Sequence, residues 1–126
     1  MLKRPTVLLE HTCRDQRHFD WLLADPGAAG GADSPLWAAR TALPSRFWEQ
    51  CRRFDLELLP PHRRVYLSYQ GPVRGDRGWV RRVDTGWVMS RLWTDHAAVL
   101  GVRMRGFCGT VALTRVCGPF WRAQVM

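Results

Sequence analysis

Strand-like segments separated by turns recur about every ten residues in this chain, and this spacing restricts the fold more than any other feature. TVLLEH (6–11), HFDWLLAD (18–25) and LWAARTAL (36–43) are short and rich in β-branched, aromatic or apolar residues. Short strands with frequent turns are typical of antiparallel barrels and sandwiches. We therefore predict a mainly β protein that forms a compact antiparallel β-barrel.

One short helix is expected among these strands. Over 45–53, Ser45 can act as an N-cap and Glu49 lies in the first turns, which predicts a helix. The stretch 60–73 begins with two prolines and then alternates between apolar and polar residues. That alternation predicts a strand with its apolar side chains on one face.

The second half of the chain continues as strands. The segment 78–88 contains DTG at 84–86, which predicts two strands joined by a turn. Gly106 divides 98–116 into two further strands, and 120–125 forms the last one. The residues expected in the core are Trp21 or Phe19, Trp37, Val80, Val111 and Leu113.

The length and the cysteines suggest the class of protein. The 126 residues predict a single domain with a flexible loop over the Gly/Ala/Pro-rich stretch 26–35. The start MLKRPTVLLEHT turns polar too early for a signal segment, and no run is long enough to span a membrane. No cysteines form a CxxC pair. We expect a monomeric, cytoplasmic protein with reduced thiols, and the alternative is a zinc site using Cys108 or Cys117.

The formal charge of +8 comes almost entirely from arginine, with Lys3 as the single lysine. Such a bias suits a polyanionic partner such as nucleic acid. Arginine-rich codon usage explains the same excess equally well. Charge alone therefore leaves both explanations open.

The stretch EHTCRDQRHFDW (10–21) is the best candidate for chemistry. His11 ends one predicted strand, His18 begins the next, and TCRDQR forms the connection. The two imidazoles would then be cross-strand neighbours, and Asp20 would share the face of His18. Two imidazoles and a carboxylate suit Mn²⁺, Zn²⁺ or Fe²⁺ and would gather within about 5 Å of one another. The alternative is a pair of unrelated surface histidines.

Four blocks of sequence, in order, resemble the 3′-phosphoesterase domain family, which occurs at the N-terminus of bacterial DNA ligase D and as short free-standing proteins. The blocks are LLEHTCRDQRHFDWLL, PLWAARTALPS, LPPHRRVYLSYQGPVRGDRGWVRRVDTGWV and VRMRGFCGTVALTRV…FWRAQ. The resemblance covers nearly the whole chain. It implies a metal-dependent phosphoesterase that processes 3′ phosphate-bearing ends of DNA or RNA in nucleic-acid repair, alone or beside a separate ligase or polymerase.

The resemblance also implies roles for individual residues. His11, His18 and Asp20 would hold the divalent metal, which we expect to be Mn²⁺, with Zn²⁺ or another transition metal as alternatives. His62 and Tyr66 would be catalytic, and we expect them to share a face of one strand. His62 would bind the phosphate or donate a proton.

Several features depart from the pattern of the family. Pro60 and Pro61 stand where an acidic residue commonly precedes the second histidine, and the loop between His11 and His18 is one residue longer than in the commonest pattern. Leu22 and Ala24 stand where the ligase-linked members usually carry an arginine and a glutamate. The arginines expected to bind phosphate or nucleic acid instead are Arg14, Arg52, Arg53 and Arg64. Trp79, in RGDRGWVRR, can stack on the end of a nucleic-acid strand or pack in the protein core, and we expect it in the core. The alternative functions are a catalytically weak or inactive nucleic-acid-binding module of the same fold, and a metal-binding scaffold for a partner.

Overall fold

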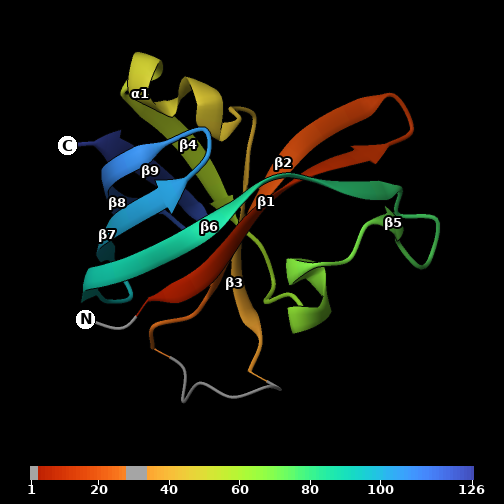
Figure 1. Ribbon diagram of the computed structural model, residues 1–126, viewed down its shortest axis with the longest axis horizontal. Coiled ribbons are helices and arrows are strands. Elements are labelled where there is room, and N and C mark those ends of the chain that lie inside the picture. The colour runs from red at the N-terminus through yellow and green to blue at the C-terminus, as the bar shows by residue number, and fades with distance from the viewer. Residues whose placement is uncertain (1–2, 28–33) are drawn as a thin grey trace.

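The computed structural model, which describes residues 3–27 and 34–126, is an antiparallel β-barrel (Figure 1). Its strands are β1 (Arg4–Cys13), β2 (Gln16–Ala24), β3 (Leu36–Thr41), β4 (Arg53–Leu58), β5 (Gly71–Pro72), β6 (Trp79–Trp93), β7 (Ala97–Met104), β8 (Cys108–Cys117) and β9 (Phe120–Val125). Eight of them, in the order β1-β2-β3-β4-β9-β8-β7-β6, close into a barrel because β1 pairs with β6 as well as with β2. The predicted fold class is confirmed. Of the loop predicted over 26–35, residues 28–33 lie outside the described residues.

The short helix is present but ends earlier than predicted. A 3₁₀ turn, η1 (Ser45–Phe47), leads into α1 (Trp48–Cys51), and Arg52 closes it in the left-handed region at φ 67°. Ser45 does not cap the helix; its hydroxyl donates to the buried Asp84 instead. A tertiary acceptor has therefore replaced the local capping bond expected from sequence.

The strand β4, directly after this helix, is not among the strands that the sequence predicts. Its apolar residues Phe54 and Leu56 alternate with charged ones, and both are buried. The period of two is therefore present in RFDLEL, but the helical signal just before it hides the change of period.

The barrel interior holds most of the predicted core. Trp21, Phe19, Val111 and Leu113 are buried there with Trp48, whose ring stacks on Phe54 at 4.5 Å. Trp37 is half-buried and packs against the edge of this cluster. The strands of the barrel wall thus show the expected alternation, with apolar side chains pointing into the interior.

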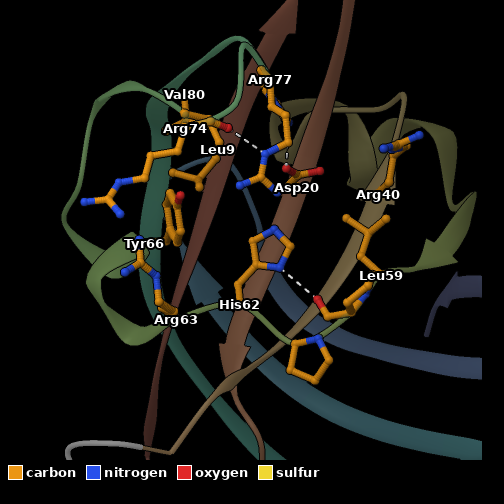
Figure 2. Close-up of a pocket in the computed structure, with 14 residues that line it drawn as sticks. Leu9, Asp20, Arg40, Leu59, His62, Arg63, Tyr66, Arg74, Arg77 and Val80 are labelled. Carbon is orange, nitrogen blue, oxygen red and sulfur yellow. Dashed lines mark hydrogen bonds and ion pairs between the residues drawn. The ribbon is translucent and has the colours of Figure 1, made fainter.

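A second apolar cluster lies on the outer face of the barrel wall and holds the remaining predicted core residue, Val80. It consists of Val7, Leu9, Leu22, Ala24, Leu36, Ala38 and Val80. Residues 59–78, which we call the cover segment, place Leu59, Tyr66, Leu67, Tyr69 and Val73 against it. Figure 2 shows His62 and Tyr66 of the cover segment facing Leu9 and Asp20 of the wall.

The prediction of a strand over 60–73 is wrong. The segment contains a 3₁₀ helix, η2 (Arg64–Leu67), and only the two-residue β5. His62 contributes a single bridge, exchanging both backbone hydrogen bonds with Leu36. The apolar side chains of this segment gain their burial by packing onto the sheet face, so the segment covers the barrel wall without extending it.

The predicted turn at 84–86 is also wrong, because β6 runs unbroken through it. Asp84 lies beside a β-bulge, where the pairing of β6 with β1 shifts between Leu8 and Leu9. A Cβ on Gly86 would lie 1.8 Å from the carbonyl oxygen of Arg103, so glycine permits a close approach of β7. Asp84 lies beside a bulge and Gly86 at a close backbone contact. The same residue types are common in turns, which explains why the sequence predicts a turn here.

Replacing Asp84 by alanine should destabilise the fold. Its buried carboxylate accepts hydrogen bonds from the Ser45 hydroxyl and from the backbone N–H groups of Arg105 and Gly106. Leaving these donors without an acceptor should lower the free energy of unfolding by about 3 kcal/mol, measured by urea denaturation. Asp55→Ala, at an exposed position of β4, should change it by no more than about 0.5 kcal/mol. Equal effects of the two variants would contradict this role for Asp84.

Within the described residues, no helix has the length and apolar character needed to cross a membrane. The four cysteines are all free, as expected. Cys13 is half-buried at the end of β1, and the other three are exposed. None of them joins a cluster of metal-ligating groups in the described part of the chain.

Candidate metal centre

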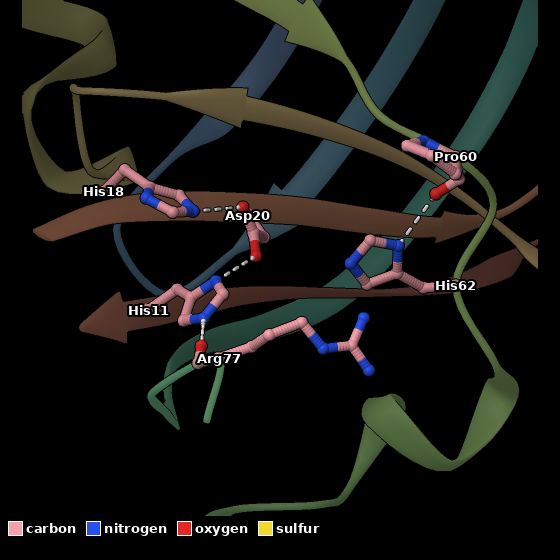
Figure 3. Close-up of polar contacts among 6 residues, drawn as sticks. All are labelled: His11, His18, Asp20, Pro60, His62 and Arg77. Atoms are coloured by element: carbon pink, nitrogen blue, oxygen red, sulfur yellow. Dashed lines mark hydrogen bonds and ion pairs between the residues drawn. The ribbon is translucent and has the colours of Figure 1, made fainter. Parts of the chain in front are cut away.

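The first hairpin brings His11, His18 and Asp20 together as the sequence predicts. His11 and His18 are direct cross-strand partners, with ring centroids 4.7 Å apart. One ligand atom from each histidine and from Asp20 lie within 4.8 Å of one another, and Figure 3 shows the three side chains converging. The expected clustering within about 5 Å is therefore confirmed.

A tight turn fixes this register. The strands extend to Cys13 and restart at Gln16, so only Arg14 and Asp15 form the turn, with Arg14 in the left-handed region at φ 56°. The connection is shorter than the expected loop TCRDQR. Because side chains alternate along a strand, a shift of one residue would move one histidine to the opposite face.

Hydrogen bonding fixes the tautomer of His11. Its Nε2 lies 2.6 Å from the backbone carbonyl of Arg77, and a carbonyl can only accept, so Nε2 carries the hydrogen. The other nitrogen, Nδ1, faces Asp20 Oδ2 at 3.2 Å. In neutral His11, two lone pairs therefore meet, and either a proton or a metal cation must lie between them. A ligand imidazole that donates its second N–H to a carbonyl is the usual support of metal-binding histidines.

Gly78 allows the Arg77 carbonyl to reach His11. Its φ of 92° lies in the left-handed region, and a Cβ there would lie 2.1 Å from the carbonyl oxygen of Thr12. No other residue fits so close to β1. The end of the cover segment thus supports the hairpin site directly.

His18 and Asp20 leave polar atoms unsatisfied in this arrangement. His18 Nε2 lies 3.0 Å from Asp20 Oδ1, but the two are not aligned as a hydrogen bond, and both atoms are buried with no partner among residues 3–27 and 34–126. Buried polar groups without partners are rare in folded proteins and costly. A divalent cation shared by the three side chains would satisfy both atoms, so the residues present fit a metal ion.

The site holds its carboxylate ionised. Burial raises the pKa of Asp20, but the adjacent imidazoles of His11 and His18 outweigh it and lower that pKa to about 2. The hydrogen bond to Asp20 is the largest effect on His11, and it raises the pKa of His11 above its usual value although burial opposes it. Asp20 is thus a ready anionic ligand, and a proton competes with metal at His11.

The affinity for Mn²⁺ should therefore rise with pH through the pKa of His11. Below that raised pKa, each ion must displace one proton, so the apparent affinity should fall about tenfold per pH unit. Calorimetric titration between about pH 6 and 8.5, in two buffers of different ionisation enthalpy, measures the protons released. His96→Ala, an exposed position between β6 and β7, should leave the profile unchanged. A flat profile would contradict the competition.

Beside this cluster the structure has a cavity of about 460 Å³, lined by both the hairpin and the cover segment. His62 and Tyr66 line it, with ring centroids 5.8 Å apart. His62 Nδ1 lies 2.9 Å from the carbonyl of Pro60, so Nδ1 donates. Its Nε2 then points toward Asp20 and His11 (Figure 3). The two residues share a cavity as predicted, although His62 lies in an isolated bridge and Tyr66 in the 3₁₀ helix η2, and not on one strand face.

The arginines that line the cavity differ from those expected. None of Arg14, Arg52, Arg53 and Arg64 lines it; the lining arginines are Arg40, Arg63, Arg74 and Arg77. Arg52 pairs with Glu49, and Arg53 donates to Gln124 on the strand β9. Arg40 is the cross-strand partner of Asp20, so a neighbouring strand brings a guanidinium next to the metal ligands. This pairing is visible only when the order of the strands is known.

The four cavity arginines are free to bind an anion. Among the described residues, none of them forms an ion pair with an Asp or Glu side chain. Leu22 and Ala24, which stand in place of the arginine and glutamate of the ligase-linked pattern, are buried under the cover segment. The cationic lining is thus supplied by other elements. Figure 2 shows Arg77 and Arg40 on the side of the cavity where Asp20 lies, and Arg63 and Arg74 on the side of Tyr66.

Trp79 does not pack in the core as we expected. Its side chain is 55% exposed at the start of β6, beside the 74–78 loop that lines the cavity. Its neighbour Val80 takes the buried position, because adjacent residues of a strand face opposite sides.

Comparison with known proteins adds no identification. No protein-family model and no curated protein matched the chain. The resemblance to 3′-phosphoesterases therefore remains a prediction.

Proposed function

We propose that this protein is a divalent-metal-dependent phosphoesterase that removes phosphate from 3′ ends of DNA or RNA. The observation that carries the proposal is one cavity that joins three convergent metal-ligating side chains to four arginines, none of which forms an ion pair with a described residue. A dianionic phosphate satisfies both sets of groups, since cations and guanidinium groups are its usual partners in proteins.

Each group has a distinct task in such a reaction. A bound divalent ion would polarise the phosphoryl group and neutralise its charge. The guanidinium groups of Arg40 and Arg77, which line the cavity, would hold the non-bridging oxygens, where charge develops during transfer. Water attacks the phosphorus as the bond between phosphorus and the 3′-oxygen breaks, and it loses a proton to solvent. His62, when protonated, can donate its Nε2 proton to the leaving 3′-oxygen, because its Nδ1 is occupied by the Pro60 carbonyl. Tyr66 packs against His62 and orients its ring.

The remainder of the chain supports a polynucleotide over a small phosphate ester. The formal charge of +8 favours a polyanion. Arg74 and Arg77 of the 74–78 loop line the cavity, where they can contact the phosphates of a polynucleotide. The proposed setting is nucleic-acid repair, in which a freed 3′-hydroxyl is then used by a ligase or polymerase.

The test is release of inorganic phosphate from a 3′-phosphate primer–template in the presence of Mn²⁺. We expect release that stops with EDTA and returns when Mn²⁺ is restored. The same duplex with its phosphate at the 5′ end is the matched control and should remain intact. Binding of both duplexes without any release would leave the alternative, a nucleic-acid-binding module of this fold. Failure to bind either duplex would point to a metal-binding scaffold.

A further inference from the structure

We infer that the outer face of β6, β7 and β8 is a second nucleic-acid contact, which binds a single-stranded stretch by base stacking on Trp87 and phosphate contacts to Arg103, Arg91 and Lys3. The inference rests on the proposed function for the class of ligand, a polynucleotide. It concerns a surface distinct from the cavity at the metal centre, with no lining residue in common.

This surface is hollowed. A depression of about 330 Å³ lies over the three strands. Two cross-strand rows form its floor, because Trp87 lies opposite Arg103 and Met89 lies opposite Gly101. Both rows continue into β8, where Arg103 meets Cys108 and Gly101 meets Thr110.

The charged groups around the hollow all have the same sign. Lys3, Arg91 and Arg103 line it, and no acidic residue in the described part of the chain does. None of the three makes an ion pair among the residues that the structure describes. Arg91 sits at the bulge between Ser90 and Leu92, which takes it out of the regular pairing with β7. Unpaired cations around a concave surface favour a polyanion that lies across it.

Trp87 gives this surface an aromatic platform. Its side chain is 50% exposed, although a large ring gains most by burial. Exposed aromatic rings between basic side chains are the usual arrangement for unpaired bases, since every base offers a face for stacking. An acidic protein partner would use the cations but leaves the ring without a specific role, so a single-stranded nucleic acid fits better.

Gly101 keeps the hollow open. A Cβ at this position would meet nothing nearer than two atoms of Met89, at 3.7 and 3.9 Å. These are ordinary contact distances, so the barrel itself does not demand glycine here. A small side chain added at Gly101 would therefore occupy the hollow without disturbing the strands.

The strand β1 runs from this surface to the metal centre. Pro5 pairs with Trp87, and His11 lies on the same face of β1. At about 3.3 Å per residue, the stretch from Pro5 to His11 spans roughly 20 Å. Figure 1 shows β6 running beside β1 from the neighbourhood of β7 to β5, so one barrel wall connects the two sites. A polynucleotide whose 3′ end occupies the cavity can contact Trp87 with bases nearer its 5′ end by passing over the cover segment, which packs on Val7 and Leu9 between the two sites.

The test measures binding of a fluorescein-labelled oligothymidylate that ends in a 3′-hydroxyl, so that no hydrolysis intervenes. Anisotropy is recorded over a range of salt concentrations for the full chain without metal. Trp87→Ala should weaken binding about tenfold or more, the usual effect of losing one base stack. Arg103→Gln should reduce the slope of log affinity against log salt by about 0.7, as one phosphate contact is lost. Gly101→Val should weaken binding while retaining the wild-type melting temperature.

Two matched variants control for general effects. Phe120→Ala removes another exposed aromatic ring on β9, and Arg122→Gln removes one exposed positive charge on the same strand. Both should bind like the wild type. If Trp87→Ala, Arg103→Gln and Gly101→Val also bind like the wild type, or if the wild type does not bind the oligonucleotide, the inference is overturned.

The outcome also separates this inference from the proposed function. If the wild-type protein binds oligothymidylate through Trp87 but releases no phosphate, the proposed enzymatic activity is contradicted and the second nucleic-acid contact is supported. Conversely, if the protein releases phosphate but its binding does not depend on Trp87, the proposed enzymatic activity is supported and the second nucleic-acid contact is contradicted.

Discussion

Replacing His18 by alanine should abolish Mn²⁺ binding and phosphate release together. His18 contributes Nε2, one of two buried polar atoms that lack a partner and that a cation would satisfy. Loss of groups that merely support a metal ligand costs about 10- to 100-fold in affinity, so loss of a ligand should weaken Mn²⁺ binding by at least about 100-fold. Calorimetric titration with Mn²⁺ and release of phosphate from the 3′-phosphate primer–template are the two measurements.

The matched control is His96, a histidine that belongs neither to the metal-ligating cluster nor to the cavity lining. It lies in the exposed turn between β6 and β7, and its side chain makes no hydrogen bond or ion pair among the described residues. His96→Ala should bind Mn²⁺ and release phosphate like the wild type. Wild-type Mn²⁺ affinity in a folded His18→Ala protein would place the metal elsewhere. Equal phosphate release by the wild type and His18→Ala would refute the proposed enzymatic activity.

Replacing His62 by alanine should separate the two measurements. His62 belongs to the cover segment, whereas the three metal-ligating side chains all come from the β1–β2 hairpin. It faces the same cavity through Nε2 without being needed to hold the ion. His62→Ala should therefore retain the wild-type Mn²⁺ affinity and lose about 100-fold or more in kcat, the usual contribution of a positioned acid or base.

A neighbouring position of the cover segment provides the control. Val65 is 49% exposed in η2, three residues from His62, and it does not line the cavity. Val65→Ala should leave both measurements unchanged, which shows that the segment tolerates substitution. If His62→Ala keeps the full rate, proton donation must come from another group. If it loses Mn²⁺ as well, His62 would belong to the metal site.

The metal ligands were predictable because their geometry is local. His11, His18 and Asp20 lie on one hairpin, and its period-two alternation decides which side chains share a face. Only the length of the turn was wrong, and the two-residue turn at Arg14 and Asp15 preserved the same pairing.

The arginines were not predictable, because they are gathered from elements far apart in sequence. Arg40 reaches the site through the pairing of β2 with β3, and Arg74 and Arg77 reach it through the loop that leads into β6. The sequence contains many arginines, and their proximity in sequence to the histidine motif says nothing of proximity in space. Arg14 is only three residues from His11, yet it lies in the turn and outside the cavity lining.

The sequence by itself determined the barrel class, most of the strands and the hairpin that carries the metal ligands. These features depend on alternation and turn chemistry within about ten residues, which local sequence encodes directly. Only the tertiary structure decided that residues 59–78 cover an outer face, that β6 is unbroken through Asp84 and Gly86, and that Arg40 stands beside Asp20. The physical reason is that burial against a distant sheet face, and hydrogen bonds to distant backbone, can outweigh local preference, and no nearby residue signals them.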